Sequence, residues 1–502
     1  MSRPRTLKSL FVPPPVDGLN LIASPSQFKP TEARVLKNYR CFDSGIRQVA
    51  CPVANLTVGG GLSIPCMVSF TNDSGTEKLI YTGDNKFWRL DNPTDSSATD
   101  ITNGTAVTND SWNVTYFNKR ILFFNGTNTP RIHDRGAGSV TDFSATGPTV
   151  ANLLQATPFK KRLYIVEKSS TKFWYGDVDA FAGTFTSFDL SSIFESSGRL
   201  AFIFSWTFNQ GDYNEELFCA VNENAEILIY SGDYPASANW QLIVRAQLPA
   251  FSSFPNPAPI LKTANEVYIV TSRGLIQLSS VVTGALQQRP YYTVSRNIKD
   301  QVSNPIPPVL DKIGPFIYAV AGSAFSANDI YCFNFERGAW SQITTSSVLS
   351  GLQITSMAYF RGYLMFGTGN STPKVYNIDL DGPTGTDDLE YTWATPFLNF
   401  GSNLQKTVQA IRMLGKNLGV STIFETAMYM AKEFVDNGTP SPPNLTQKVD
   451  TVAQNAQVVQ ELSPFGGTGR WLSFVFTRDT NTDTELNEYQ GFEVLYEEGG
   501  LY

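Results

Sequence analysis

Histidine is nearly absent from the sequence, which has one, His133, in 502 residues. The common zinc sites take several ligands from histidine and cysteine, so a histidine-rich metal site is excluded. A Ser-His-Asp or Cys-His hydrolase would depend on His133 alone, and the surrounding PRIHDRG has no companion catalytic motif. We therefore interpret His133 as a turn residue at the edge of a sheet and predict that the protein is not an enzyme.

Cysteine is scarce as well. The cysteines are odd in number and none has C-x-x-C spacing, which favours reduced thiols of a cell interior over a disulfide framework. The five are Cys41, Cys51, Cys66, Cys219 and Cys332.

Charge and long apolar runs are also limited. Charged residues make up 17 % of the chain, the net charge is −7, and no run of five or six basic residues occurs, so tight nucleic-acid binding is not indicated. No segment approaches the roughly 20 apolar residues that a membrane-spanning helix needs. Pro13, Pro14 and Pro15 interrupt a short apolar piece before a signal-peptide core could form, so we expect an extended N-terminal arm over residues 1–30.

Short clusters of Val, Ile, Phe and Tyr are abundant, and they indicate strands rather than helices. The clusters recur at spacings of 42 to 54 residues, as in KLIYTGD, and in most units a short turn leads to a second strand, as in FWRLD and LIQLSS. Repeats of this size built from strand pairs are typical of propeller blades. The units begin at Leu79, Ile121, Leu163, Leu217, Val267, Ile317 and Tyr363.

We therefore predict an all-β protein, with a β-propeller of six to eight blades over residues 31–380 and a small β-sandwich domain over residues 381–502. The second domain is indicated by the alternating patterns YTWATPFLNF, TVQAIRML, STIFETAMYM, RWLSFVFT and YQGFEVLY. The segment TEARVLKNYRCFDSGIRQVACP, before residue 60, fits either a strand that closes the ring or a separate arm.

The stretch EILIYSGDYPASANWQLI, from Glu226 to Ile243, has two apolar runs around a Ser-Gly-Asp turn. A sialidase-type box needs Asp and Trp closer together around a glycine, whereas Asp233 and Trp240 are seven residues apart with no glycine between them. We interpret the stretch as the inner hairpin of one blade, with Trp240 as an apolar wedge between blades.

The stretch NIDLDGPTGTDD resembles a calcium loop. Asn377, Asp379 and Asp381 alternate before Gly382, and Asp388 stands at position twelve. Calcium is thus the one cofactor that the sequence suggests, although Asp388 is shorter than the usual Glu and no flanking helices are expected. The alternative is a solvated linker in which Asp, Gly and Pro are turn residues.

Several longer runs carry a resemblance to a known family. They are ARVLKNYRCFDSGIRQVA, ILIYSGDYPASANWQLIVRAQLPAF, PILKTANEVYIVTSRGLIQLSSVV, DIYCFNFERGAWSQI, YFRGYLMFGTGN, KVYNIDLD and TPFLNFGSNLQKTVQAIRML. In this order they resemble the propeller-containing tail nozzle, or distal tail-tube, proteins of short-tailed (podovirus-type) bacteriophages. The resemblance covers most of the chain, rests on short apolar motifs, and carries over no catalytic residue.

The resemblance implies a structural virion component, a homo-oligomer and usually a hexamer, that forms a tail ring through which DNA is ejected. It also implies assembly in the host cytoplasm, contacts with the tail adaptor or portal-side ring and with tail fibres or spikes, and a transient, non-specific passage of duplex DNA. An acidic subunit suits this role, because each phosphate that a protein neutralises adds affinity that would hold the DNA. The alternative function is a glycan-binding propeller, a receptor-recognition or lectin-like module, with Trp88, Trp174 and Trp340 as exposed stacking platforms.

Overall fold

The structure is a computed structural model that describes residues 7–24, 27–57, 63–210, 213–287, 293–322, 329–345, 349, 352–369, 372–380, 382, 389–416, 424–431, 444–449, 463–478 and 487–499. Strands make up 53 % of the chain and helices 4 %. The prediction of an all-β protein is therefore confirmed.

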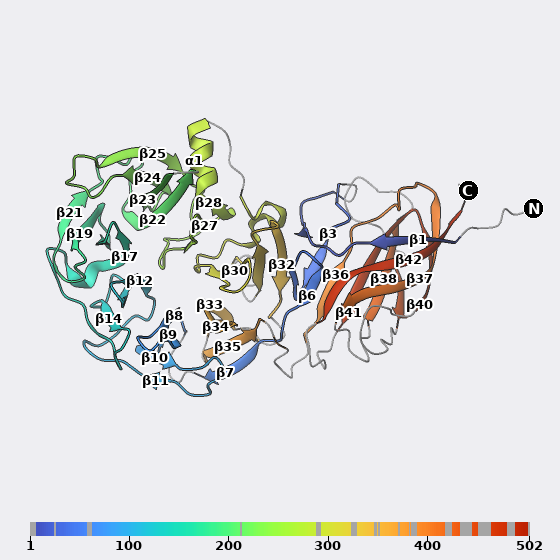
Figure 1. The fold of residues 1–502 in the computed structure, drawn as a ribbon, viewed down its shortest axis with the longest axis horizontal. Helices are drawn as coiled ribbons and strands as arrows, with labels where there is room; N and C mark the ends of the chain where they lie inside the picture. Colours follow the sequence, from blue (N-terminus) through green and yellow to red (C-terminus); the bar gives the residue numbers. More distant parts are fainter. Residues whose placement is uncertain are drawn as a thin grey trace, which may run out of the picture.

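Seven sheets of three or more strands follow one another between residues 53 and 379 in the described part of the chain, and Figure 1 shows them arranged around a common centre. In each of the first four sheets the strands run outward from the centre in chain order (Figure 1). These four sheets consist of β8 (Cys66–Thr71), β9 (Glu77–Gly83), β10 (Lys86–Leu90) and β11 (Thr99–Asp100); β12 (Asn113–Phe117), β13 (Arg120–Phe124), β14 (Arg131–Asp134) and β15 (Thr141–Asp142); β17 (Leu153–Phe159), β18 (Arg162–Glu167), β19 (Lys172–Val178) and β21 (Thr186–Asp189); and β22 (Leu200–Gln210), β23 (Tyr213–Asn222), β24 (Glu226–Ser231) and β25 (Gln241–Gln247).

The seventh sheet takes its outermost strand from the N-terminal part of the chain. The fifth sheet is β26 (Ile260–Lys262), β27 (Val267–Thr271) and β28 (Gly274–Gln277), and the sixth contains β29 (Val309–Leu310), β30 (Phe316–Val320), β31 (Ile330–Asn334) and β32 (Ala339–Ile343). The seventh is β33 (Gln353–Phe360), β34 (Tyr363–Gly369) and β35 (Lys374–Asp379), to which β7 (Val53–Thr57) adds antiparallel. The segment TEARVLKNYRCFDSGIRQVACP itself ends at Pro52, before β7, and its strands pair with the sixth sheet and with C-terminal strands. The strand that completes the seventh sheet therefore comes from the residues directly after this segment.

Short turns and small elements connect these strands. Asp84 and Asn85, between β9 and β10, both have positive φ, at 58° and 57°. A two-residue hairpin turn with two positive φ angles is of type I′, whose twist matches the twist of the paired strands. The remaining elements are the two-stranded parallel sheets β2 (Gly18–Leu19) with β3 (Glu32–Ala33) and β16 (Ala145–Thr146) with β20 (Gly183–Thr184), the 3₁₀ turns η1 (Val150–Asn152) and η2 (Arg296–Gln301), and the helix α1 (Leu278–Gln287).

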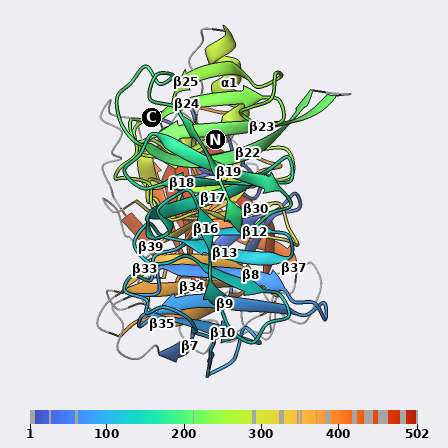
Figure 2. The ribbon, with the colours of Figure 1, turned by 90° about the vertical axis from the view of Figure 1, so that its left-hand side faces the viewer.

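Each pair of neighbouring sheets encloses an apolar core of its own. Between the first and second sheets the rings of Phe87 and Phe123 lie 5.1 Å apart, edge to face. The seventh and first sheets meet in the same way, since Phe360 and Met365 are buried in one cluster with Tyr81. Figure 2 views the array from the side and shows β22 and β23 extending beyond the neighbouring hairpins.

The C-terminal strands, joined by strands from the N-terminal region, form two further layers beside the sixth sheet (Figure 1). One layer has the order β40-β37-β42-β6-β5, with β1 also paired to β42. The other continues the sixth sheet into a nine-stranded sheet of order β29-β30-β31-β32-β4-β36-β41-β38-β39. The strands are β1 (Leu7–Val12), β4 (Val35–Lys37), β5 (Tyr39–Cys41), β6 (Ile46–Gln48), β36 (Tyr391–Ala394), β37 (Gln405–Lys416), β38 (Phe424–Ala431), β39 (Asn444–Val449), β40 (Ser463–Gly469), β41 (Trp471–Arg478) and β42 (Glu488–Gly499).

Aromatic side chains fill the space between these two layers. The ring of Phe492 on β42 lies 5.4 Å from Trp393, 5.3 Å from Phe474 and 4.8 Å from Phe476, which all belong to the opposite layer. The same buried cluster includes Trp340 of the sixth sheet, so the core continues from the C-terminal layers into the sheet array.

A buried ion pair lies where the N-terminal strands meet the sixth sheet. Arg40 on β5 and Asp311, between β29 and β30, approach within 3.7 Å, and their side chains are 3 % and 2 % exposed. The guanidinium also lies over the rings of Phe42 and Phe316. Neither charge has water to solvate it, so each depends on the other.

Strand pairing crosses the boundaries that we placed between the arm, the propeller and the second domain. Within residues 1–30, β1 pairs with β42 from Leu7↔Glu497 to Val12↔Phe492. Three strands in the range predicted for the propeller also join the C-terminal layers: β4 pairs with β36, β6 pairs with β42, and β5 pairs with β6.

Two local predictions are wrong. The stretch around Trp240 supplies β24 and β25, the outer pair of the fourth sheet, and is not the inner hairpin. The LIQLSS segment, read as one strand, leaves the sheet at Gln277, and α1 follows. Leu278, Val281 and Val282 recur at helical spacing and are buried against the fourth and fifth sheets, which explains the change of structure.

Candidate functional site

An axial cavity of about 200 Å³ lies where the first strands of the sheets approach one another. Five sheets contribute side chains from their first strands, and loop residues complete the lining. The lining residues from these strands are Cys66 and Met67 on β8, Asn113 and Val114 on β12, Gln155 on β17, Ile260 on β26, and Thr355, Ser356 and Met357 on β33.

Polar side chains link the first strands of neighbouring sheets. Gln155 donates to the carbonyl of Ile203 at 2.9 Å and accepts from its amide at 3.0 Å, which joins the third sheet to the fourth. Lys262 donates to the hydroxyl of Ser205 at 2.6 Å, which joins the fifth to the fourth, and burial lowers the pKa of this lysine. These contacts account for the polar residues near the axis, because a buried polar group must find a partner.

The segment before β26 reaches Asn113, three sheets earlier in the array. The amide nitrogen of Asn113 donates to Asn256 Oδ1 at 2.7 Å and to the carbonyl of Leu154 at 2.9 Å. Its oxygen accepts from the backbone N–H of Ala258 at 2.8 Å, and Pro257 lines the cavity beside them. Residues 256–258 of the chain itself therefore lie at this end of the axis, beside the cavity.

His133 is not a turn residue, which corrects our interpretation. It lies within β14, is fully buried, and packs edge to face against Phe70 with 5.1 Å between ring centroids. Both ring nitrogens are buried without a hydrogen-bond partner in the described part of the chain, and burial lowers the pKa of His133 to about 4. No nucleophile is hydrogen-bonded to it there, so His133 does not form a catalytic pair in this structure.

The predicted tryptophans have different environments. Trp340 is buried, so its prediction as an exposed platform is wrong; it stacks on Phe333 at 4.6 Å. Trp88 and Trp174 are partly exposed. Trp240 stacks on Tyr230 of its own sheet at 5.0 Å and lies 6.0 Å from Phe159 of the third sheet, as a wedge between sheets would.

The predicted calcium residues do not all fall within the described chain. Asn377 is buried on β35, where its amide donates to Asn55 Oδ1 at 2.7 Å and to the carbonyl of Pro93 at 2.9 Å. Asp379 ends the same strand and accepts from the N–H of Gly382 at 2.9 Å. Asp381 and Asp388 lie outside the described residues, so the calcium loop stays a prediction.

A second cavity, of about 390 Å³, opens between the first and second sheets and is lined by cations. Lys78 on β9, Arg89 on β10 and Arg135, just after β14, face it, with Asp73 as the one carboxylate of its lining. The remaining lining residues are Phe70, Asn72, Ser74, Gly136 and Ala137. We call this cavity the basic cleft.

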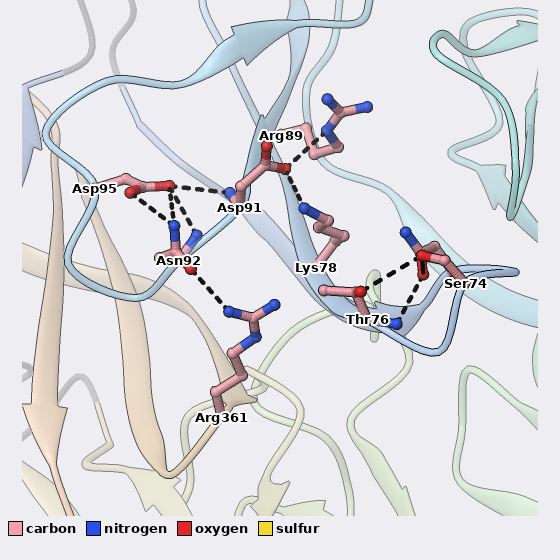
Figure 3. Close-up of polar contacts among 9 residues, drawn as sticks. Ser74, Thr76, Lys78, Arg89, Asp91, Asn92, Asp95 and Arg361 are labelled. Carbon is pink, nitrogen blue, oxygen red and sulfur yellow. Dashed lines mark hydrogen bonds and ion pairs between the residues drawn. The ribbon is translucent and has the colours of Figure 1, made fainter.

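Hydrogen bonds hold two of the cations that line the basic cleft, and Figure 3 draws these contacts. Lys78 Nζ and Arg89 Nε converge on Asp91 Oδ1 at 3.0 and 3.1 Å. Partial burial opposes the charge of Asp91, but the hydrogen bonds from Lys78 and Arg89 hold its pKa below the usual value. The Asn72 side chain accepts from the Ser74 hydroxyl and the Thr76 N–H, both at 2.8 Å, and so shapes the rim loop.

Arg135 is the cation of the basic cleft that has no counter-ion in the described part of the chain. Among the described residues it makes no ion pair, and its Nε is buried without a hydrogen-bond partner. The Asp73 carboxylate lies against Gly136, where an added Cβ would come within 2.7 Å of Asp73 Oδ2. The loops of the two sheets therefore meet at the rim of the cleft.

Sequence reasoning missed the basic cleft. Arg89 and Arg135 lie 46 residues apart, about one repeat, and Lys78 comes from a different strand of the first sheet. A repeat brings corresponding loops of neighbouring units together, so comparing charges at equivalent repeat positions could have found this cluster.

The described residues contain no group of three or more His, Cys, Asp or Glu that could hold a metal ion, and no helix among them is long and apolar enough to cross a membrane. All five cysteines are buried thiols. Burial raises the pKa of Cys66 and Cys332 to about 12, which disfavours the reactive thiolate.

Comparison with family models and with curated proteins finds no match. Among solved structures, the chain is similar to the WD40 β-propeller domain of Doa1, with a TM-score of 0.40 and 10 % sequence identity. The match covers 65 % of this chain and 97 % of that one.

Proposed function

We propose that the seven sheets are the blades of a closed propeller and that the two C-terminal layers form a β-sandwich. Closure is supported by β7, which gives the last blade a strand from the N-terminal side of the array, and by the apolar cluster between the seventh and first sheets. Closing a ring of sheets in this way leaves few free edges.

The function that the molecule supports best is that of a structural subunit of a short phage tail, which assembles into a ring through which DNA is ejected. The observation that carries this proposal is the nine-stranded sheet, which runs without interruption from the sixth blade into the C-terminal layer. The shared sheet joins the seven-sheet array rigidly to the C-terminal layers, and a ring that bears mechanical load needs such rigid subunits. Two domains on a flexible linker would move independently.

The axial contacts of Asn113 bear on where DNA would pass. Because the chain fills the axis and leaves a cavity of about 200 Å³, DNA would have to run between copies and not through one propeller. Six copies at −7 each carry −42, and a passage bounded by such a ring repels phosphates and keeps the duplex centred.

The partners follow from this role: five further copies of the chain, the adaptor or portal-side ring on one face, and fibres or spikes around it, all in the tail of the virion. Strand β1 offers a contact surface, because its Leu7 and Phe11 are 54 % and 52 % exposed at the edge of the C-terminal layers.

The proposal is tested by light scattering and negative-stain images of the purified full chain. It requires a ring of about six subunits with a central hole, either alone or after addition of the adaptor ring. A chain that remains monomeric in both conditions argues against it.

A second candidate function is glycan binding, favoured by the partial exposure of Trp88 and Trp174. A sugar stacked on either tryptophan would cover the exposed part of that aromatic side chain. A glycan array with the wild-type chain and with Trp88→Ala and Trp174→Ala variants separates the two functions, since a conduit subunit requires no array signal that depends on these residues.

A further inference from the structure

We propose that the basic cleft binds a small organic molecule carrying a carboxylate or phosphate group, held by Arg135, Arg89 and Lys78. This inference is independent of the proposed tail function, because it rests on one cavity within a single chain.

The first argument is the charge of the lining. Three cationic side chains and one carboxylate face the cavity, in a chain whose net charge is −7. Asp91 forms ion pairs with Lys78 and Arg89 and so offsets part of their positive charge. Arg135 has no ion pair among the described residues. Partial burial of a guanidinium without a counter-ion costs free energy, and a bound anion would offset this cost.

The second argument is the donor geometry. Arg89 uses its Nε on Asp91, and among the described residues no acceptor is hydrogen-bonded to its two terminal nitrogens. Arginine binds carboxylates and phosphates through such paired N–H groups, which makes it suited to oxyanions. Two arginines and a lysine from two sheets therefore present donors to one space.

The third argument is size. The cavity of about 390 Å³ falls in the range of small-molecule pockets rather than of sites for a single ion. Asn72 and Ser74 on the rim loop add an amide and a hydroxyl beside the cations. These groups suit the hydroxyls of a sugar-sized ligand, so we expect an acidic sugar or a sugar phosphate to bind more tightly than free phosphate.

The test is calorimetric titration of the full chain, at constant ionic strength, with glucuronate, glucose 6-phosphate, inorganic phosphate and glucose. We expect both anionic sugars to bind, phosphate to bind more weakly, and glucose not to bind. Arg135→Gln removes the cation that has no ion pair to lose and should weaken binding at least about tenfold, the typical effect of losing a charge-assisted hydrogen bond. Lys78→Gln should weaken binding in the same direction.

The matched control is Arg361→Gln. Arg361 is a cation of the same region, but it donates to Asn92 Oδ1 at 2.8 Å and does not line the cleft (Figure 3). The Arg361→Gln substitution should leave the affinity for the anionic sugars unchanged. Equal weakening by Arg135→Gln and Arg361→Gln, binding of phosphate as tight as that of the anionic sugars, or no binding to the wild type would each overturn the proposal.

Discussion

His133 should make the stability of the protein depend on pH in a way that one substitution can isolate. Burial against Phe70 lowers the pKa of the ring from 6.5 to about 4, because the cation would have neither water nor a hydrogen-bond acceptor. Between these two values the unfolded chain binds a proton that the folded chain does not. The contribution of His133 is therefore complete above pH 6.5 and is lost as the pH falls towards 4.

The size of this effect follows from the shift. A difference of roughly 2.5 pKa units corresponds to about 3 kcal/mol of unfolding free energy. His133→Leu has a similar volume and no titrating group. The wild type should thus lose about 3 kcal/mol more than His133→Leu between pH 7 and pH 4, and carboxylates that titrate in both proteins cancel from the comparison.

Urea denaturation of both proteins at a series of pH values measures this difference. Because the chain has a single histidine, the imidazole signal in an NMR titration is assigned without ambiguity. A ring that titrates near pH 6.5, or parallel stability profiles for the two proteins, would refute the reasoning, since either result means that the ring is solvated in the folded state.

Three further substitutions and one binding measurement test other parts of the account. Asp311→Ala leaves the Arg40 charge buried without its ion-pair partner and should cost about 3–5 kcal/mol by urea denaturation; a loss below 1 kcal/mol contradicts the burial of the pair. Trp240→Ala removes a half-buried ring between two sheets and should cost about 2–3 kcal/mol, and an unchanged midpoint of unfolding would argue against its role as a wedge. Asn113→Ala leaves three backbone or side-chain partners unsatisfied and should speed hydrogen exchange at the Ala258 amide, whereas unaltered exchange there would mean that the axial segment is held by other contacts. Duplex DNA should bind weakly with a shallow dependence on salt in a filter assay, and a steep salt slope would show that the chain neutralises several phosphates.

The repeat was predictable from the sequence because the second strand of a sheet, such as β9, is buried on both sides. The segment KLIYTGD therefore has the consecutive apolar residues of such a strand, and FWRLD after the turn forms β10 as expected. The first strands escaped notice because they lie next to the axis. The side chains of Asn113, Gln155 and Ser356 form hydrogen bonds near the axis. These polar residues interrupt the apolar pattern of the first strands.

Other features depend on contacts between residues far apart in the chain. The residues next to His133 in the sequence do not indicate that its ring is buried against Phe70, which lies 63 residues earlier. Strands β4 and β6 pair with β36 and β42, more than 300 positions later in the chain, so no local pattern could decide what the segment TEARVLKNYRCFDSGIRQVACP does. The basic cleft could not be found from any local pattern for the same reason, since Arg89 and Arg135 line one cavity only after the first two sheets pack together.

The central claim, that copies of this chain enclose a passage for DNA, is tested most directly by a three-dimensional electron-microscopy reconstruction of the assembled ring. The account predicts a lumen between the chains that admits a duplex, an acidic lumen wall, and a propeller axis in each copy that remains filled around Asn113. A ring whose lumen is lined by basic side chains, or an assembly whose opening runs through the propeller axis, would contradict it.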